Sequence, residues 1–380
     1  MKTVCLLGST GSIGVQTLDV LRAMGNGYRV EALVAGRKWE ALRAQALEFK
    51  PAAVGLIDPD AYKALKSAGL PNGTRIVCGA DETAALAADS QITVNGITGA
   101  AGLPGSLAAV RAGKALALAN KESMVMAGPL LRAEVARTGA SILPVDSEHN
   151  AIFQAMRAGS PHEVKRILLT ASGGPFRTLP REQFSTITPQ MALKHPNWDM
   201  GPKITVDSST MMNKALEIVE ARWLFDLPTD RIEVLVHPQS IIHSMVEFRD
   251  GSIIAQLGAP DMRTPIQYAL TYPDRAPGAG TPLDLSKPVT LNLEPPDLER
   301  FPSIRFGFEA ARRGGTAGAI LNAANEVAVE RFLAGRIPYL KIFEIAEAAL
   351  ADAADSGELT LSRVMEADRR AREAAARRAA

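Results

Sequence analysis

Three acidic side chains in two distant segments have the types and spacing of a metal site. Asp146 and Glu148 follow the apolar run Ser141 to Val145. In an extended segment, side chains at i and i+2 point the same way, so these two carboxylates would offer hard oxygen ligands to Mg²⁺ or Mn²⁺. Asp-x-Glu is also typical of a solvated helix start, which is the alternative here. Glu217 is the candidate third carboxylate.

The segment Ser209 to Phe225 has the pattern of one helix and carries a candidate phosphate site. Asn213, Lys214 and Glu217 fall at i, i+1 and i+4 and share one side, with Ser208 at the helix start. A hydroxyl, an amide and an ammonium at a helix N-terminus favour a dianionic phosphate. The alternative is an N-capped amphipathic helix with a Lys214–Glu217 surface pair.

A glycine-rich loop indicates a dinucleotide site near the N-terminus. The apolar run Thr3 to Leu7 leads into Gly8, Gly11 and Gly14, which open a helix predicted over Ser12 to Met24. Glycines let the backbone approach a pyrophosphate, and free N–H groups at the helix start favour the anion. The spacing differs from G-x-G-x-x-G, and a plain turn between strand and helix is the alternative.

Two cations follow the second predicted strand, where an NAD enzyme usually has an acidic residue. Arg37 and Lys38 come directly after Gly36. They can neutralise a 2′-phosphate, so NADP(H) is favoured over NAD(H). The alternative is that both are ordinary solvated charges.

Other polar residues stand where ligands gather, beyond strand ends. Asn120, Lys121 and Glu122 follow the run Ala115 to Ala119. Residues 172–202 are rich in Pro, Thr and Gln, and a structureless segment of this length is typical of a lid.

Within that segment, Trp198 and Met200 would provide apolar cover and His195 a substrate contact. Trp198 is equally consistent with a loop anchor. All five histidines lie between His149 and His243; only His195 is assigned to substrate, and His149 and His237 fit a structural or a site role.

The elements that must position these residues form an α/β protein. Residues 1–145 alternate near-continuous apolar runs with helical segments, which predicts a Rossmann-like, doubly wound parallel sheet. Residues 146–271 indicate a central α+β catalytic domain, with paired strands around a turn at Arg249 to Gly251. Residues 272–302 contain seven prolines and read as a linker. Residues 303–380 predict a C-terminal helical bundle with a frayed Ala/Arg tail.

Composition excludes several classes of protein. The 42 basic and 41 acidic residues give a net charge of +1, which argues against nucleic acid or an anionic membrane as the main partner. Two cysteines, Cys5 and Cys78, indicate neither a disulfide framework nor a cysteine zinc site. With no signal-like or membrane-spanning run, we expect a soluble cytoplasmic protein.

Six motifs in succession resemble one family, 1-deoxy-D-xylulose 5-phosphate reductoisomerase. They are Gly8 to Gly14, Asn120 to Glu122, Pro144 to Asn150, Ala171 to Phe176, His195 to Gly201 and Val206 to Lys214. The resemblance runs from residue 3 to about residue 345. One departure is Lys38, where members often carry Asn, and the end after Met365 matches no motif.

The resemblance implies the roles of individual residues. NADPH would contact Thr10, Gly11, Ser12, Ile13, Gly36, Arg37, Lys38, Asn120, Glu122 and Gly201, beside Gly8 and Gly14 of the loop. Mg²⁺ or Mn²⁺, with Co²⁺ as a further candidate, would be held by Asp146, Glu148 and Glu217. The sugar phosphate would contact Lys121, Ser147, Ser172, His195, Trp198, Ser208, Asn213 and Lys214, and the metal ligands Glu148 and Glu217.

The implied activity is conversion of 1-deoxy-D-xylulose 5-phosphate to 2-C-methyl-D-erythritol 4-phosphate, in the non-mevalonate route to isoprenoids, by a homodimer. The metal would act as a Lewis acid during rearrangement, Lys121 would support the developing charge, and NADPH would then deliver hydride. A retro-aldol and aldol route is favoured over a direct ketol shift. The alternatives are an NADP-dependent semialdehyde or homoserine dehydrogenase and a non-catalytic NADPH-binding protein.

Overall fold

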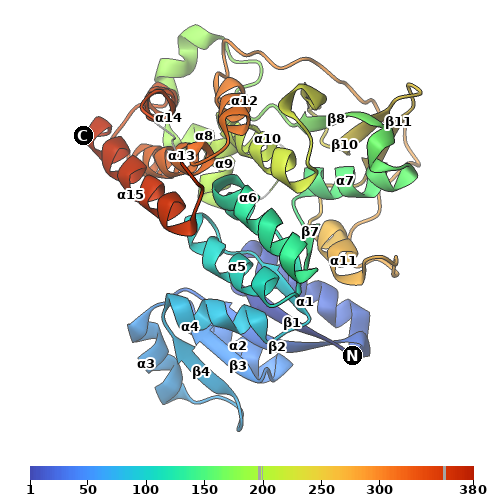
Figure 1. Ribbon diagram of the computed structural model, residues 1–380, viewed down its shortest axis with the longest axis vertical. Helices are drawn as coiled ribbons and strands as arrows, with labels where there is room; N and C mark the ends of the chain where they lie inside the picture. Colours follow the sequence, from blue (N-terminus) through green and yellow to red (C-terminus); the bar gives the residue numbers. More distant parts are fainter. Residues whose placement is uncertain (196–197, 199, 354–356) are drawn as a thin grey trace. The chain divides into compact units, whose positions relative to one another are not determined.

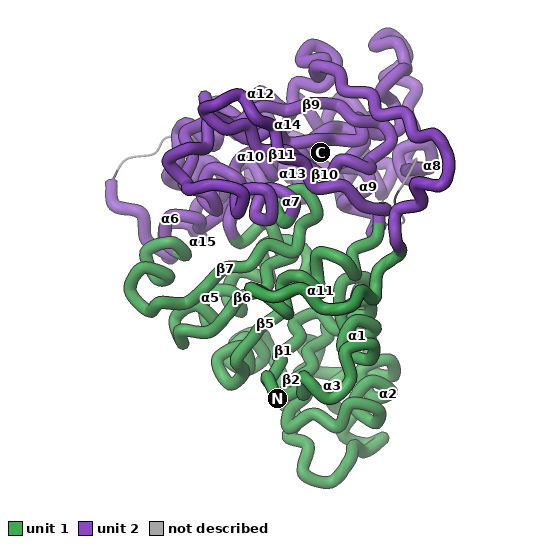
Figure 2. Tube along the Cα trace, turned by 90° about the vertical axis from the view of Figure 1, so that its right-hand side faces the viewer, with its two compact units in different colours: residues 1–123, 131–150, 261–281 green, residues 124–130, 151–260, 282–380 purple. Residues whose placement is uncertain are grey.

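The computed structural model describes residues 1–195, 198, 200–353 and 357–380. Its contacts divide the chain into two compact units, coloured separately in Figure 2. Unit 1 comprises residues 1–123, 131–150 and 261–281, and unit 2 comprises residues 124–130, 151–260 and 282–380. The four-part division predicted from the sequence stays a prediction.

Unit 1 contains a seven-stranded sheet with the order β4-β3-β2-β1-β5-β6-β7, and every neighbouring pair is parallel. The near-continuous apolar runs are the reason, because strands covered on both faces bury every side chain. β3 and β5, for example, are buried along their whole length. The strands are β1 (Lys2–Leu7), β2 (Tyr28–Ala35), β3 (Ala53–Leu56), β4 (Arg75–Cys78), β5 (Ile92–Asn95), β6 (Ala115–Leu118) and β7 (Ser141–Pro144).

Helices cover the sheet as the predicted doubly wound fold requires (Figure 1). The strand order reverses after β4, so right-handed crossovers place the earlier and later helices on opposite faces. Accordingly, α2 packs on α3, and α4 packs on α5. The helices are α1 (Ser12–Met24), α2 (Trp39–Phe49), α3 (Pro59–Ala68), α4 (Ala80–Ala85), α5 (Leu103–Arg111), α6 (Lys121–Thr138), of which residues 124–130 belong to unit 2, and α11 (Arg263–Thr271), which packs on α1.

Unit 2 contains the predicted antiparallel pairing in a four-stranded sheet of order β11-β10-β8-β9. β10 (Ile242–Phe248) and β11 (Ile253–Leu257) form the hairpin around the expected turn, and β10 also pairs antiparallel with β8 (Val164–Ala171). β9 (Ile232–Val236) runs parallel to β8. The helix α7 (Ser147–Ala155) begins in unit 1, and unit 2 adds α8 (Pro189–Ala192), α9 (Pro202–Ser209) and α10 (Met212–Leu224).

The C-terminal helices share one apolar core with these elements. Tyr339 is fully buried in an aromatic cluster with Phe176, Phe184, Phe332 and Phe343. Such edge-on ring contacts stabilise a core beyond the area they bury. The helices are α12 (Ser303–Arg313), α13 (Ala317–Leu333), α14 (Leu340–Ala351) and α15 (Leu361–Arg378).

The expectation of a frayed C-terminal tail is wrong. α15 is helical to Arg378 and packs along α13. Ala371 and Ala375 are buried, and the guanidinium of Arg372 pairs with Glu326 and Asp368. The small side chains of Ala371 and Ala375, at i and i+4, let α15 lie close to α13. The composition of the tail did not indicate this buried face.

No helix among the described residues is long and apolar enough to cross a membrane.

Candidate functional site

The glycine loop in unit 1 has the geometry of a phosphate cradle. It lies where the strand order reverses between β1 and β5, the usual ligand crevice of such sheets. Gly8 has a positive φ of 83°, and a Cβ at this position would lie 2.9 Å from the backbone of Gly96. At Gly14, a Cβ would lie 2.4 Å from the carbonyl oxygen of Gly8. Any larger residue at these positions would push the loop apart.

The start of α1 is open to an anion. Gly11 is its N-cap residue and provides no side-chain hydrogen bond, so the first backbone N–H groups keep their donor capacity. Ser12 and Ile13 begin the helix, after Thr10 of the loop. The amides of Gly8 and Ser9 both donate to the carbonyl oxygen of Val34, which fixes the loop to the end of β2.

The end of β2 presents its cations to solvent. Arg37 is 87% exposed, and its Nε lies 3.2 Å from Asp58 Oδ2. Lys38, exposed as well, precedes α2, and Gly36 has open space where a Cβ would be. Both cations are therefore exposed at the end of β2, and neither is packed into the core.

Asn120 organises the end of β6. Its side-chain amide donates to Ile97 O at 2.7 Å, to Gly99 O at 2.9 Å and to Glu122 Oε2 at 3.0 Å. Its Oδ1 caps α6 by accepting the backbone N–H of Ser123. One buried amide thus sets both the loop after β5 and the carboxylate of Glu122.

Lys121 and Asp146 form a buried ion pair. Lys121 Nζ lies 2.5 Å from Asp146 Oδ2, and the side chains are 7% and 9% exposed. They meet because β6 and β7 are neighbouring parallel strands, with Leu118 opposite Pro144. His149 Nδ1 lies 3.4 Å from Asp146 Oδ1. Burial opposes ionisation of Asp146, but Lys121 and the contact with His149 outweigh it and hold the pKa of that carboxyl well below its usual range.

The predicted extended geometry around Asp146 is wrong. Ser147 and Glu148 begin α7, and Asp146 Oδ1 accepts the backbone N–H of Glu148 at 3.2 Å, as an N-terminal carboxylate does. Asp146 is buried, and Ser147 and Glu148 are half-buried, so the helix start is less solvated than in the alternative interpretation. Ser147 Oγ donates to Glu148 Oε2 at 2.6 Å. Lys121, Asp146, Ser147 and Glu148 are thus gathered in unit 1 by β6, β7 and α7.

In unit 2, the helix predicted over Ser209 to Phe225 is α10, which begins at Met212, later than predicted, and ends at Leu224. α9 ends at Ser209, Met211 takes a left-handed conformation with φ of 59°, and α10 begins at Met212. Ser208 therefore lies at the C-terminal end of α9 and not at a helix N-terminus. Within the break, Thr210 Oγ1 accepts the backbone N–H of Met212.

Asn213, Lys214 and Glu217 are close together on α10 as predicted. Asn213 Nδ2 donates to Glu217 Oε1 at 2.6 Å, and Lys214 Nζ pairs with Glu217 Oε2. The side chains of Lys214 and Glu217 are 3% and 1% exposed, so this is not the surface pair of the alternative interpretation. A buried ion pair at a helix start is costly unless a ligand or further partners use it.

Ser172 and His195 meet at the base of the predicted lid. Ser172 Oγ lies 3.1 Å from His195 Nε2, and His195 Nδ1 accepts the backbone N–H of Trp198 at 3.0 Å. The Trp198 ring lies 6.2 Å from the ring of His243. Burial lowers the pKa of His195 to about 4. Gly201 is the N-cap residue of α9.

The segment 172–202 is less irregular than predicted. Residues 196–197 and 199 lie outside the described residues. Arg181–Thr186 forms a 3₁₀ helix and Pro189–Ala192 forms α8, and Phe184 and Ala192 are fully buried in the core of unit 2. A segment anchored by a buried aromatic ring does not move as a single body, so Arg181–Ala192 does not fit the predicted structureless lid.

Asp207 and Asn325, next to the residues of unit 2 described above, had no role assigned from the sequence. Asp207 on α9 is 1% exposed and accepts hydrogen bonds from Lys203 Nζ at 2.9 Å and Asn325 Nδ2 at 2.8 Å. The sequence signal for a buried polar contact is the pair Asn322 and Asn325, which interrupts the small and apolar residues of Ala317 to Asn325.

His237 has a structural role. Its Nδ1 lies 2.7 Å from Asn292 O, and its Nε2 accepts the backbone N–H of Ile241. It ties the linker to the loop after β9.

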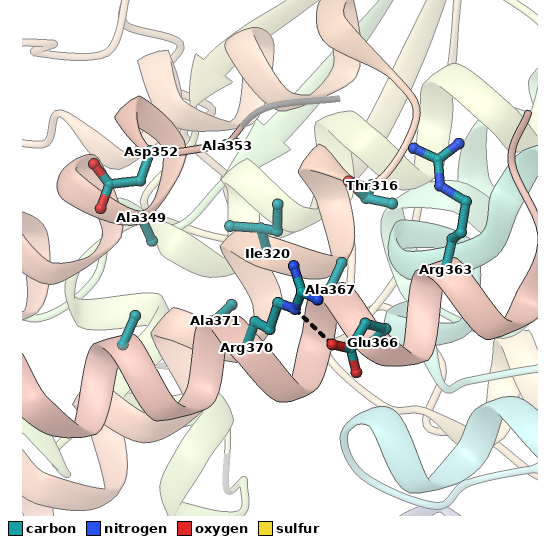
Figure 3. Close-up of a pocket in the computed structure, with 11 residues that line it drawn as sticks. Thr316, Ile320, Ala349, Asp352, Ala353, Arg363, Glu366, Ala367, Arg370 and Ala371 are labelled. Carbon is teal, nitrogen blue, oxygen red and sulfur yellow. Dashed lines mark hydrogen bonds and ion pairs between the residues drawn. The ribbon is translucent and has the colours of Figure 1, made fainter. Parts of the chain in front are cut away.

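A pocket among the C-terminal helices has no predicted site residue in its lining (Figure 3). Its cavity volume is about 470 Å³, and α13, α14 and α15 contribute to its lining. Arg370 donates to Glu366 at 2.5 Å, so these charges compensate each other. We assign no role to this pocket.

Comparison with known proteins finds similarity to one family along most of the chain. Three family models match the chain. Residues 4–128 match the model of 1-deoxy-D-xylulose 5-phosphate reductoisomerase. Residues 142–225 match the model described as 1-deoxy-D-xylulose 5-phosphate reductoisomerase C-terminal domain, and residues 257–374 match a separate model described as DXP reductoisomerase C-terminal domain. The chain is 51% identical to 1-deoxy-D-xylulose 5-phosphate reductoisomerase of Symbiobacterium thermophilum, over 98% of both chains. It is 50% identical to that of Cupriavidus metallidurans, over 99% of this chain and 97% of the other.

Solved structures agree with the sequence comparison. The reductoisomerase from Zymomonas mobilis in complex with NADPH has a TM-score of 0.93 at 44% identity, covering 100% of this chain and 98% of that one. A DOX-P reductoisomerase in complex with NADPH, fosmidomycin and magnesium has a TM-score of 0.94 at 42% identity, with the same coverage.

Proposed function

Because the chain belongs to the 1-deoxy-D-xylulose 5-phosphate reductoisomerase family, we propose that it isomerises and reduces 1-deoxy-D-xylulose 5-phosphate to 2-C-methyl-D-erythritol 4-phosphate. The reaction requires NADPH and a divalent cation, both present in solved relatives. It supplies isoprenoid precursors by the non-mevalonate route. The observation that carries the proposal is the buried Lys121–Asp146 pair, since a carboxylate held ionised out of water suits a metal ligand beside a reacting oxygen.

The residues of unit 1 fit NADPH. The glycine loop has no room for a Cβ at Gly8 or Gly14, and the start of α1 lacks a side-chain cap, which suits a pyrophosphate. Exposed Arg37, with Lys38, suits a 2′-phosphate. We assign cofactor contacts to the loop residues Gly8 to Gly14, to Gly36, Arg37 and Lys38, and to Asn120, Glu122 and Gly201.

The acidic residues fit Mg²⁺ or Mn²⁺. Asp146, Glu148 and Glu217 offer only hard oxygen ligands, which these cations prefer and which a Co²⁺ ion would also accept. The support comes from each unit by itself: Asp146 is kept ionised in unit 1, and Glu217 is buried on α10 in unit 2. We propose that all three bind the same ion.

The protein's own side chains do the following in the reaction. When bound, the metal ion provides Lewis-acid catalysis and NADPH provides hydride. Lys121 places a positive charge where the substrate oxygens become negative. Ser147 and Glu148 face the same oxygens, and Trp198 excludes water. Ser172, His195, Ser208, Asn213 and Lys214 bind the sugar phosphate.

The direct test is turnover by purified protein. With the sugar phosphate and NADPH, loss of reduced-nicotinamide absorbance should require added Mg²⁺ or Mn²⁺ and should stop after complete chelation. The product should have the mass of the substrate plus two hydrogens. Activity that survives metal removal would favour the semialdehyde or homoserine dehydrogenase alternative, and NADPH binding without turnover would favour the non-catalytic one.

We also propose that the protein works as a cytoplasmic homodimer. β11 is an edge strand with Ile253, Ile254 and Leu257 at 51%, 38% and 41% exposure. An uncovered apolar edge strand invites pairing with another chain, and a second copy would cover it. Cys5 and Cys78 are free thiols, as expected in a reducing compartment.

A further inference from the structure

Side chains from the C-terminal helices hold the end of α9, where Ser208 lies. Asn325 Nδ2 on α13 donates to Asp207 Oδ1 at 2.8 Å. The hydroxyl of Tyr339, the residue before α14, donates to Ser209 O at 2.7 Å. The residue before Ser208 and the residue after it are thus both anchored by a distant part of the chain, and α13 packs directly on α9 (Figure 1).

These anchors are buried and specific. Asp207 is 1% exposed, and its second oxygen accepts from Lys203 Nζ at 2.9 Å. A buried carboxylate that loses a donor is destabilised by its lost solvation, so Asn325 helps to fix the position of Asp207 from the side of α13. Tyr339 is fully buried among phenylalanine rings, which leaves its hydroxyl one direction in which to donate.

The end of α9 needs such anchors. Met211 is left-handed with φ of 59°, a conformation that a non-glycine residue adopts only where its surroundings impose it. The loop that carries Ser172 also contacts the end of α9, since a Cβ on Gly174 would lie 2.6 Å from Ser208 O. A shift at Asp207 or Ser209 would therefore move Ser208 relative to Ser172.

We propose that Asn325 and Tyr339 are positioning residues for the phosphate group of the substrate. They act through Asp207 and the Ser209 carbonyl to fix the Ser208 hydroxyl, and they do not touch the substrate. The inference rests on the proposed function, because it takes Ser208 as a phosphate ligand. Binding of a dianion requires its donors to be held to within about 0.5 Å, and loose support costs affinity.

The test compares Asn325→Ala with Asn322→Ala. Asn322 is equally buried on the same helix, but its amide donates to Glu326 at 3.0 Å. We expect Asn325→Ala to raise the KM for the sugar phosphate and the inhibition constant of inorganic phosphate about tenfold. The kcat should change less than about threefold, and the KM for NADPH should not change. Asn322→Ala should leave all four constants near those of the wild type.

Tyr339→Phe provides an independent variant that removes one oxygen and keeps the ring in the core. It should raise the same two constants about threefold, so the inference remains testable even if Asn325→Ala fails to fold. Unchanged phosphate constants in Tyr339→Phe, or an equal rise in Asn322→Ala, would overturn the positioning role. A wild-type protein without turnover would instead overturn the proposed function.

Discussion

Lys121 Nζ lies 2.5 Å from Asp146 Oδ2, in a pair that neighbouring parallel strands bring together. Because the pair is buried, its two charges interact strongly, and Asp146 keeps its negative charge well below neutral pH. Removing either partner leaves the other charge buried and uncompensated. The pair therefore keeps Asp146 ionised, as a metal ligand must be, and keeps the ammonium of Lys121 charged for contact with the substrate oxygens.

Replacing Lys121 should damage chemistry more than cofactor binding. We expect Lys121→Met to lower kcat about 10²- to 10³-fold, because the ammonium no longer faces the reacting oxygens. The dissociation constant of NADPH, measured by fluorescence titration, should stay within about threefold. Lys114, just before the opposite end of β6, is the matched control, and Lys114→Met should retain full activity. An unchanged kcat in Lys121→Met would remove Lys121 from the catalytic group.

Metal binding by both segments is testable with a double-mutant cycle. Asp146→Asn and Glu217→Gln should each weaken Mn²⁺ binding in calorimetry, and Glu217→Gln should abolish turnover while NADPH still binds. If both carboxylates bind one ion, either substitution should reduce the free energy of Mn²⁺ binding much less in the presence of the other substitution than it does in the wild type. Effects that add to within about 0.5 kcal/mol would mean that the two carboxylates serve separate sites.

Discrimination between cofactors should depend on Arg37, whose guanidinium is exposed beside Asp58. Arg37→Ala should raise the KM for NADPH about tenfold or more and leave the KM for NADH unchanged, since only NADPH carries the 2′-phosphate. Arg29→Ala, at the opposite end of β2, is the control. Equal effects on both cofactors would show that Arg37 does not recognise the 2′-phosphate.

Much of unit 1 was predictable because its signals are local. The helix predicted over Ser12 to Met24 agrees residue for residue with α1, and the apolar run Ala115 to Ala119 contains β6. Buried parallel strands are continuous apolar runs, and the helices between them begin after glycine or polar residues. Lys121 and Asp146 follow from the same logic, since both stand just beyond strand ends.

The errors occurred where distant contacts decide the local structure. A Met residue does not favour the left-handed conformation, so the break at Met211 between α9 and α10 could not be predicted from its residue type. The Ala/Arg composition of α15 is typical of a solvated helix, yet Ala371 and Ala375 are buried, and the helix packs on α13, which is distant in the sequence. The bond from Asn325 to Asp207 spans 118 residues, so no local pattern could assign it.

The edge strand β11 should control assembly. Ile253→Lys combined with Leu257→Lys places charges on an exposed apolar edge, which opposes strand pairing between copies. We expect a wild-type dimer and a monomeric variant in sedimentation velocity at micromolar concentration. Leu285→Lys, which alters a 70% exposed leucine in the linker, should remain dimeric. A variant that stays dimeric would exclude β11 from the interface.

His195 should stay neutral throughout the physiological pH range. Its Nδ1 accepts the Trp198 N–H, so the hydrogen is on Nε2, which donates to Ser172 Oγ, and burial lowers the pKa to about 4. Because the unfolded chain takes up this proton near pH 6.5, the neutral form stabilises the fold above that pH. The contribution is lost as the pH falls from about 6.5 to 4. The free energy of unfolding should therefore decline more in wild type than in His195→Gln when urea denaturation is repeated from pH 7 to pH 4.5. Parallel declines in the two proteins, or a His195 imidazole resonance that titrates between pH 6 and 7, would contradict a neutral, buried His195.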